Sequence, residues 1–212
     1  RLFAEGAGVK IRTRLFLAFL ALVGLGFYLL MDWGIRDLQP RYLETMEESM
    51  VDTATLLASL LSSDLAEGKM PLDGLRAAFD EARRRTLSAT IYDVTKTNLN
   101  VRVYVTDRRG IVVFDSDHGA DEGKDYSRWN DVVRTLRGEY GARATRTNPQ
   151  DPGTAILCVA APVKKGEETV GVLTVCKPAS SVKLFLRSSK RKIVAGGLLA
   201  AAALLLLGLI TS

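Results

Sequence analysis

One short polar segment gathers the side chains with the most chemical options. His118, the only histidine, follows Asp115 and Asp117 in the run Asp-Ser-Asp-His-Gly. These groups could offer oxygen and nitrogen ligands to a cation, but one histidine with scattered carboxylates makes neither a catalytic triad nor a zinc site. We interpret the segment as a solvated turn, and we expect no catalytic residue and no metal site in this chain.

The only cysteines, Cys158 and Cys176, fall on two expected strands that a tight hairpin connects. If Val163 pairs with Thr169, Cys158 faces Thr174, and a register shift of two residues would place the cysteines directly opposite each other. The sequence leaves two buried thiols and a possible disulfide both open.

A third group of residues could line a ligand pocket. In segment 101–106 valines alternate with Arg102 and Tyr104, which therefore share the face of the strand opposite the valines. Aromatic side chains from a following helix could form a lid, and arginines further along could supply positive charge for an anionic ligand. The alternative of ordinary packing and surface residues stays open. The candidate ligand-binding residues are Arg102, Tyr104, Tyr126, Trp129, Arg143 and Arg146.

Helices and strands in a distinctive order would position these residues. Apolar periodicity predicts a long helix over 41–65, restarting after Pro40, and a shorter helix over 72–85. Alternation and turn residues predict strands at 101–106 and 111–114, a helix over 126–136, and strands near 140–147, 155–163 and 169–176. A last helix is expected from Pro178 to residue 192. The fold class is thus α+β, with a five-stranded antiparallel sheet and a long N-terminal helix.

Two uncharged apolar runs predict transmembrane helices on either side of this domain. Residues 15–31 and 193–210 are each long enough to cross a bilayer. Trp33 ends the first run with an interfacial aromatic, and no signal-peptidase site follows, which favours an uncleaved anchor. We therefore expect a cytoplasmic N-terminus at 1–14, transmembrane helices at 15–33 and 193–212, and an extracytoplasmic domain at 34–192.

The charge distribution supports this topology and excludes a nucleic-acid partner. The net charge of +5 is concentrated beside the apolar runs, at 10–14 and 187–192, so no basic stripe remains for a phosphate backbone. Lys10, Arg12 and Arg14 place the N-terminus inside by the positive-inside rule, although the basic residues 187–192 on the outer side disagree. The chain lacks an initial Met and ends just after an apolar run, so we expect the parent protein to continue.

Several long segments resemble a known family. The runs VYVTDRRGIVVFDSD, GKDYSRWNDVV and VAAPVKKGEETVGVLTV are similar to the first hairpin, the helix and the last hairpin of extracytoplasmic PAS-like (single Cache) sensor domains. DTATLLA, TLRGEYGARAT and residues 159–178 resemble, more narrowly, the CreC-type two-component sensor histidine kinases. The resemblance covers most of the chain and departs from the family at Cys176 and in 70–100.

This resemblance implies the sensory and anchoring region of a multi-pass receptor in the bacterial inner membrane. It implies a homodimer, a small-molecule or periplasmic protein signal, and a cognate response regulator. ATP and Mg are expected only for a kinase core outside this chain. The alternatives are the same sensor joined to a chemoreceptor or cyclase output, and a periplasmic interaction module without a signalling role.

Overall fold

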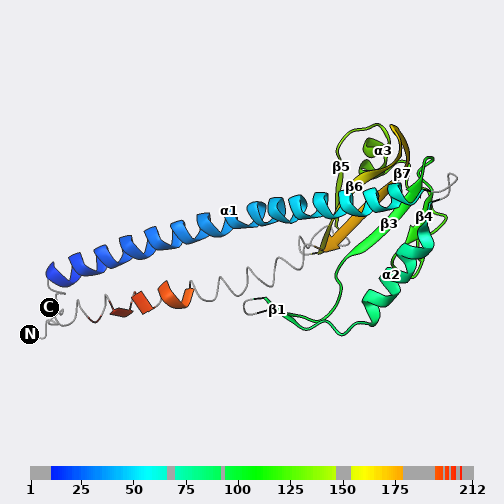
Figure 1. The fold of residues 1–212 in the computed structure, drawn as a ribbon. Coiled ribbons are helices and arrows are strands. Elements are labelled where there is room, and N and C mark those ends of the chain that lie inside the picture. Colours follow the sequence, from blue (N-terminus) through cyan, green and yellow to red (C-terminus); the bar gives the residue numbers. More distant parts are fainter. Residues whose placement is uncertain are drawn as a thin grey trace, which may run out of the picture. The chain divides into compact units, whose positions relative to one another are not determined.

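The computed structural model describes residues 11–65, 70–91, 94–146 and 154–178, together with 194–197, 199–200, 202–203 and 206. These residues belong to two compact units, one from Arg1–Arg41 and Leu186–Ser212 and the other from Tyr42–Phe185. The helix α1, Ile11–Ser63, contributes to both units (Figure 1). It runs without interruption through Pro40, so the expected restart of the helix at that residue is wrong.

In the first unit, the residues of 194–206 that the structure describes are helical and meet the N-terminal half of α1. A side chain added at Gly197 would collide with the ring of Phe27, which shows how closely the two segments pack. Within the described part of the chain, no helix has both the length and the apolarity that a bilayer crossing requires. Much of 193–212 lies outside the described residues, as does most of the expected helix 178–192. The two transmembrane helices stay predictions.

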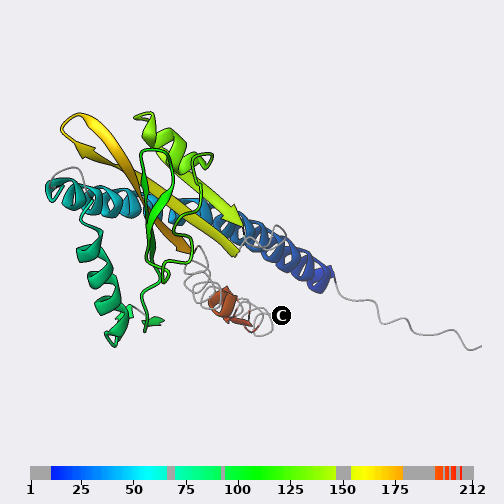
Figure 2. The ribbon, with the colours of Figure 1, turned by 90° about the vertical axis from the view of Figure 1, so that its right-hand side faces the viewer.

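The second unit is built on a five-stranded antiparallel sheet in the order β4-β3-β7-β6-β5 (Figures 1 and 2). Its strands are β3 (Arg102–Asp107), β4 (Val112–Asp115), β5 (Gly141–Arg146), β6 (Ala155–Lys165) and β7 (Glu168–Pro178). The expected α+β class with five antiparallel strands is confirmed. Pro178 ends β7, whereas the sequence places it at the start of a helix.

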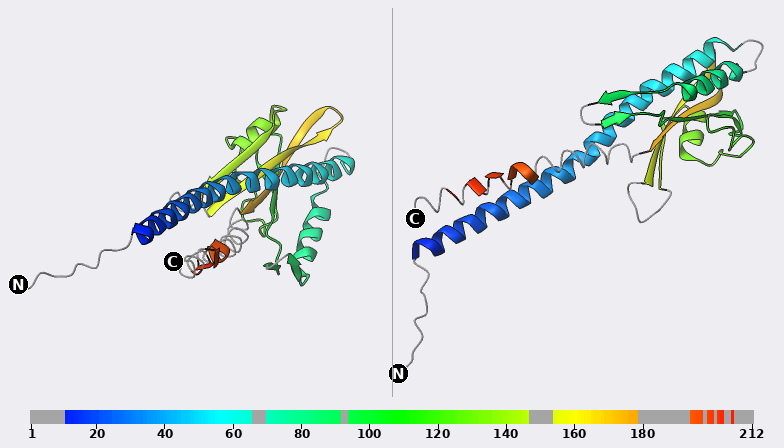
Figure 3. Two further views of the ribbon diagram at one scale, coloured as in Figure 1. Left: turned by 90° about the vertical axis from the view of Figure 1, so that its left-hand side faces the viewer. Right: turned by 90° about the horizontal axis from the view of Figure 1, so that it is seen from below.

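One face of the sheet packs on the C-terminal part of α1 (Figure 3). The buried residues of that helix recur at steps of three and four, which forms a single stripe: Met46, Met50, Ala54, Ala58 and Leu61. Val103 and Val105 of β3 are fully buried, as the alternation in the sequence predicts. The backbone N–H of Lys164 also donates to Ser62 Oγ, at 2.9 Å, and ties the β6 end to the helix.

The other face of the sheet carries a second cluster beneath helix α3 (Asn130–Leu136). Its buried members are Tyr104, Val112, Tyr126, Val132, Cys158, Ala160, Val172 and Cys176. The unit also contains helix α2 (Leu72–Arg84), close to the predicted range, and a small hairpin of β1 (Ala89–Ile91) and β2 (Val94–Lys96). The hairpin is not predicted from the sequence. Figure 1 shows α2 beside the β3–β4 edge.

A bulge sets the register of the hairpin that carries the cysteines. Lys165 pairs with Glu168 and Lys164 with Thr169, but the next pair is Val163 with Gly171, so Val170 is an extra residue on β7. The pairing of Val163 with Thr169 considered from the sequence is therefore wrong by two residues. Cys158 lies directly opposite Cys176 as a result.

Candidate functional site

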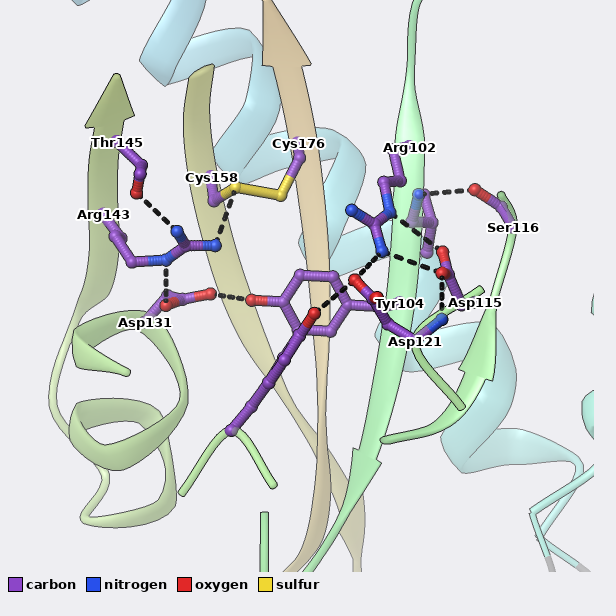
Figure 4. The surroundings of a disulfide bond; sticks show 12 residues. Arg102, Tyr104, Asp115, Ser116, Asp121, Asp131, Arg143, Thr145, Cys158 and Cys176 are labelled. Atoms are coloured by element: carbon purple, nitrogen blue, oxygen red, sulfur yellow. Dashed lines mark hydrogen bonds and ion pairs between the residues drawn. A yellow bond between two sulfur atoms is a disulfide. The ribbon is translucent and has the colours of Figure 1, made fainter. Parts of the chain in front are cut away.

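A cleft of about 480 Å³ opens on the sheet face that carries the second cluster. Its lining comes from β3, β5, β6, β7, the end of α2, the segment before β3, the loop after β4 and the residue that precedes α3: Arg83, Leu99, Asn100, Val101, Arg102, Tyr104, Asp117, Trp129, Arg143, Thr145, Ile156, Cys158, Cys176 and Pro178. Figure 4 shows the labelled side chains on the side of the sheet that faces away from α1. The volume lies within the range of small-molecule sites.

The two cysteines are joined in a disulfide in the wall of this cleft. Both side chains are buried, and the bond links the neighbouring strands β6 and β7 (Figure 4). The guanidinium of Arg143 lies beside it, with Nη2 3.4 Å from Cys158 Sγ. Of the two states that the sequence leaves open, the structure has the disulfide.

Arg143 belongs to a buried ionic network with Asp131 and Tyr104. Its Nε donates to Asp131 Oδ1 at 2.9 Å, and the hydroxyl of Tyr104 donates to Asp131 Oδ2 (Figure 4). The side chain of Asp131 is fully buried and that of Arg143 is only 18% exposed. Burial and the charge of Asp131 raise the pKa of Tyr104 above its ordinary value, so the phenol stays protonated and remains a donor.

Helix α3 reaches this network because Gly141 lets it approach the sheet. A Cβ atom at Gly141 would collide with Thr135 Oγ1 and with the backbone carbonyl of Asp131. Thr135 Oγ1 in turn donates to that carbonyl at 2.7 Å. The missing side chain at the start of β5 therefore sets the distance between Asp131 and Arg143, two residues further along the strand.

Arg102 forms a second network at the β4 side of the cleft. It donates to Asp115 in bidentate fashion, with Nε–Oδ1 at 2.9 Å and Nη2–Oδ2 at 2.8 Å, and it also pairs with Asp121. Tyr126 donates its hydroxyl to Asp121. Burial alone would raise the pKa of Asp121, but hydrogen bonds from Lys124, Tyr126 and Arg102 lower it well below the ordinary range.

The aromatic residues form a stack rather than an open lid. The rings of Tyr126 and Trp129 are stacked with centroids 3.5 Å apart, and the Arg143 guanidinium carbon lies 3.9 Å from the centre of the Trp129 ring. Tyr104 meets Tyr126 edge to face at 5.2 Å. These contacts fix the aromatic side of the cleft.

The structure therefore brings together most of the residues that the sequence singles out. Arg102, Tyr104, Trp129 and Arg143 line the cleft, and Tyr126 supports it from behind Trp129. Arg146 is exposed at the end of β5, does not line the cleft, and by strand alternation faces away from Arg143. Their role in ligand binding stays a prediction.

The charged partners of the site are missing from the predicted ligand-binding set, although Asp115 was considered as a possible cation ligand. Asp115, Asp121 and Asp131 neutralise the two arginines, and Arg83 reaches the cleft from α2. The sequence shows these acidic residues as separate carboxylates at the end of a strand, in a loop and in a helix, and it carries no signal for their partners. His118 adopts a left-handed backbone conformation in its turn, and within the described residues no cluster of three or more His, Cys, Asp or Glu side chains is placed to hold a metal ion.

The fold and the site together define the class of protein. It is an α+β domain with a five-stranded antiparallel sheet and a charged cleft on one face of that sheet. No family model matches the chain. The chain is 39% identical over 186 residues to the sensor protein CreC of Escherichia coli (strain K12), a match that covers 88% of this chain and 39% of that protein. The resemblance to CreC-type sensors is confirmed, and the chain spans about two fifths of the relative's length.

Solved structures with a similar chain trace include two receptor domains. The crystal structure of the V. cholerae histidine kinase DctB sensor domain is 16% identical, with a TM-score of 0.44 over 75% of this chain and 60% of that chain. An extracellular ligand binding receptor from Desulfohalobium retbaense is 15% identical, with a TM-score of 0.38 over 73% of this chain and 25% of that one.

Proposed function

We propose that this chain is the sensory and membrane-anchoring region of a two-component sensor histidine kinase of the CreC type. The observation that carries the proposal is the 39% identity to the E. coli sensor protein across 88% of the chain. A match over 186 residues is longer than the cleft-bearing unit, Tyr42–Phe185, and therefore continues into the flanking segments. It therefore favours a shared sensory role over a shared fold alone.

The proposed arrangement in the membrane comes from the sequence. Segments 15–33 and 193–212 cross the inner membrane, 1–14 lie in the cytoplasm, and 34–192 form the periplasmic domain. The uncharged runs and the basic residues at 10–14 support this topology. The disulfide is a second, independent support, because disulfides persist in the oxidising periplasm and are rare in the cytoplasm.

The catalytic work belongs to the remainder of such a kinase. Histidine autophosphorylation with ATP and Mg, and transfer to a response regulator, need a phosphoacceptor helix and a nucleotide-binding domain. The residues of this chain instead receive a signal, and we place the reception of a small molecule in the cleft. The signal passes through a homodimer. Binding favours one of two arrangements of the helices that enter the membrane, and both chains of the dimer take part in that change.

Reporter fusions and a chimera test the proposal. Alkaline phosphatase inserted at Gly166, in the β6–β7 turn, should be active in bacteria, whereas a fusion after Ser212 should be inactive. The same chain joined to the remaining part of E. coli CreC should be phosphorylated from ATP in membranes. An inactive reporter at Gly166 would overturn the topology, and a chimera that is inserted and dimeric but never phosphorylated would count against the kinase assignment.

A further inference from the structure

Helix α2 is held to the domain by few contacts. None of its residues is buried. Arg76 donates to Glu122 Oε1 at 2.7 Å and lies 5.3 Å from the centre of the Phe114 ring, and Phe79 packs on the same ring at 6.0 Å. An element that buries so little opens at low free-energy cost compared with the sheet.

The last turn of this helix brings a cation into the cleft. Arg83 lines the cleft, and its Nη1 is buried without a hydrogen-bond partner. The carboxylate that faces it is Asp117, but Oδ1 lies 3.9 Å from Arg83 Nη2, beyond hydrogen-bond range. A buried donor without a partner is costly, so an acceptor placed in the cleft beside Arg83 would be stabilised.

The other two arginines of the lining are already committed. Arg102 is bound by two carboxylates, and Arg143 by Asp131 and the face of Trp129. An anion that approached either of them would compete with a carboxylate of the protein. Among the arginines of the described lining, Arg83 is thus the one that still has a hydrogen-bond donor free to bind a ligand.

We propose that the cleft binds a small organic anion whose oxyanion group, a carboxylate or a phosphate, is held by Arg83, and that this bond fixes helix α2 on the domain. The inference rests on the proposed sensory function, since it takes the cleft as the place where the signal binds. Asn100 supplies an amide beside the anion, and Ile156, Pro178 and the disulfide give the cleft an apolar wall for the body of the ligand. The volume of about 480 Å³ accepts a molecule with a single ring.

Ring compounds that differ only in their charged group test the proposal on the full chain. Benzoate and phenyl phosphate represent the two oxyanions, and benzylamine and benzyl alcohol are the cationic and neutral controls. At least one anion should raise the melting temperature by mass action and slow amide hydrogen exchange in 72–84, while both controls leave these quantities unchanged. Which anion binds more tightly separates a carboxylate site from a phosphate site.

Matched variants assign the effect to Arg83. Arg83→Gln should weaken the anion about tenfold or more, as expected for the loss of a charge-assisted hydrogen bond, and Arg83→Lys should recover part of the affinity. Arg84→Gln is the control, because Arg84 lies on the same turn with a side chain 73% exposed. Asp117→Asn should bind the anion more tightly than the wild type, which a purely structural role of Arg83 would not produce.

Two results would overturn the inference: no anion affects the wild-type chain, or Arg83→Gln binds the anion as tightly as Arg84→Gln does. If amide hydrogen exchange in 72–84 did not change when the chain was saturated with a bound anion, the claim that the anion fixes α2 on the domain would be refuted. The reporter fusions and the chimera do not depend on any of these measurements, so failure of the inference is distinguishable from failure of the proposed function.

Discussion

Arg143 Nε lies 2.9 Å from Oδ1 of Asp131, a carboxylate that is fully buried and that also accepts the hydroxyl of Tyr104. The pair joins the edge strand β5 to helix α3 across the end of the cleft. Neither group can be removed without leaving the other with an unmet charge in a region of low solvent access.

The first prediction concerns this pair. Asp131→Asn should lower the free energy of unfolding by about 3 kcal/mol, near the lower end for a broken buried ion pair because Arg143 keeps some exposure. Denaturant titration of the chain in detergent measures it. Arg134→Gln is the control: Arg134 lies on the same helix as Asp131, and its pair with Glu139, which follows the end of that helix, is half exposed and should be worth less than about 1 kcal/mol. Equal losses in the two variants would contradict the importance of the buried network.

The second prediction concerns the disulfide. The bond closes a loop with a sequence separation of 18, so Cys158→Ser with Cys176→Ser should cost about 3 kcal/mol of stability. A reductant should lower the melting temperature of the wild type and leave the double variant unaffected. Thiol labelling of the unreduced, denatured chain should modify no cysteine, and two labels per chain would refute the bond.

The third prediction concerns acid. Hydrogen bonds from Arg102 overcome the effect of burial and keep the pKa of Asp115 below its ordinary value, and the pKa of Asp121 is lowered in the same way. The stability that this adds is complete above the unfolded-state pKa of about 4, and it is lost as the pH falls through the folded-state values. Melting temperatures of wild type and Asp121→Asn should therefore differ most near neutral pH and converge below about pH 4. A difference in melting temperature that stayed constant with pH would contradict the dependence of stability on the ionisation of Asp121.

The fourth prediction concerns the approach of α3 to the sheet. Gly141→Ala places a methyl group against Thr135 and the carbonyl of Asp131, and should destabilise the domain by about 1–3 kcal/mol. Gly74→Ala is the control, because nothing lies near its Cβ position in α2 and alanine favours the helix by up to about 1 kcal/mol. Thermal unfolding should thus move in opposite directions for the two alanines.

The sequence predicts the sheet well because its signal is local. Alternation in 101–106 separates Val103 and Val105 from Arg102 and Tyr104, and the structure puts these pairs on opposite faces. The β1–β2 hairpin is missed because its strands have three residues each, which is too short for an alternation of apolar and polar residues to be recognised. The helix break at Pro40 is wrong, since the helix continues across that proline.

The site is harder to predict because its contacts are long-range. The carboxylates that bind Arg102 and Arg143 lie 12 to 19 residues away along the chain, and only the packed fold brings them together. The cysteine pairing depends on one extra residue, Val170, and no count from the turn can reveal a bulge. Arg83 requires the placement of α2, which a helical pattern does not give.

The covalent link between Cys158 and Cys176 also determines how force travels through the sheet. It lies two residues from the point where β7 ends, at Pro178, opposite Ile156. Strands held only by hydrogen bonds can slip past each other by a register step, but these two cannot slip while the sulfurs are bonded. A displacement of β6 along its own axis must therefore move β7 with it at this point, and reduction of the bond would remove that constraint.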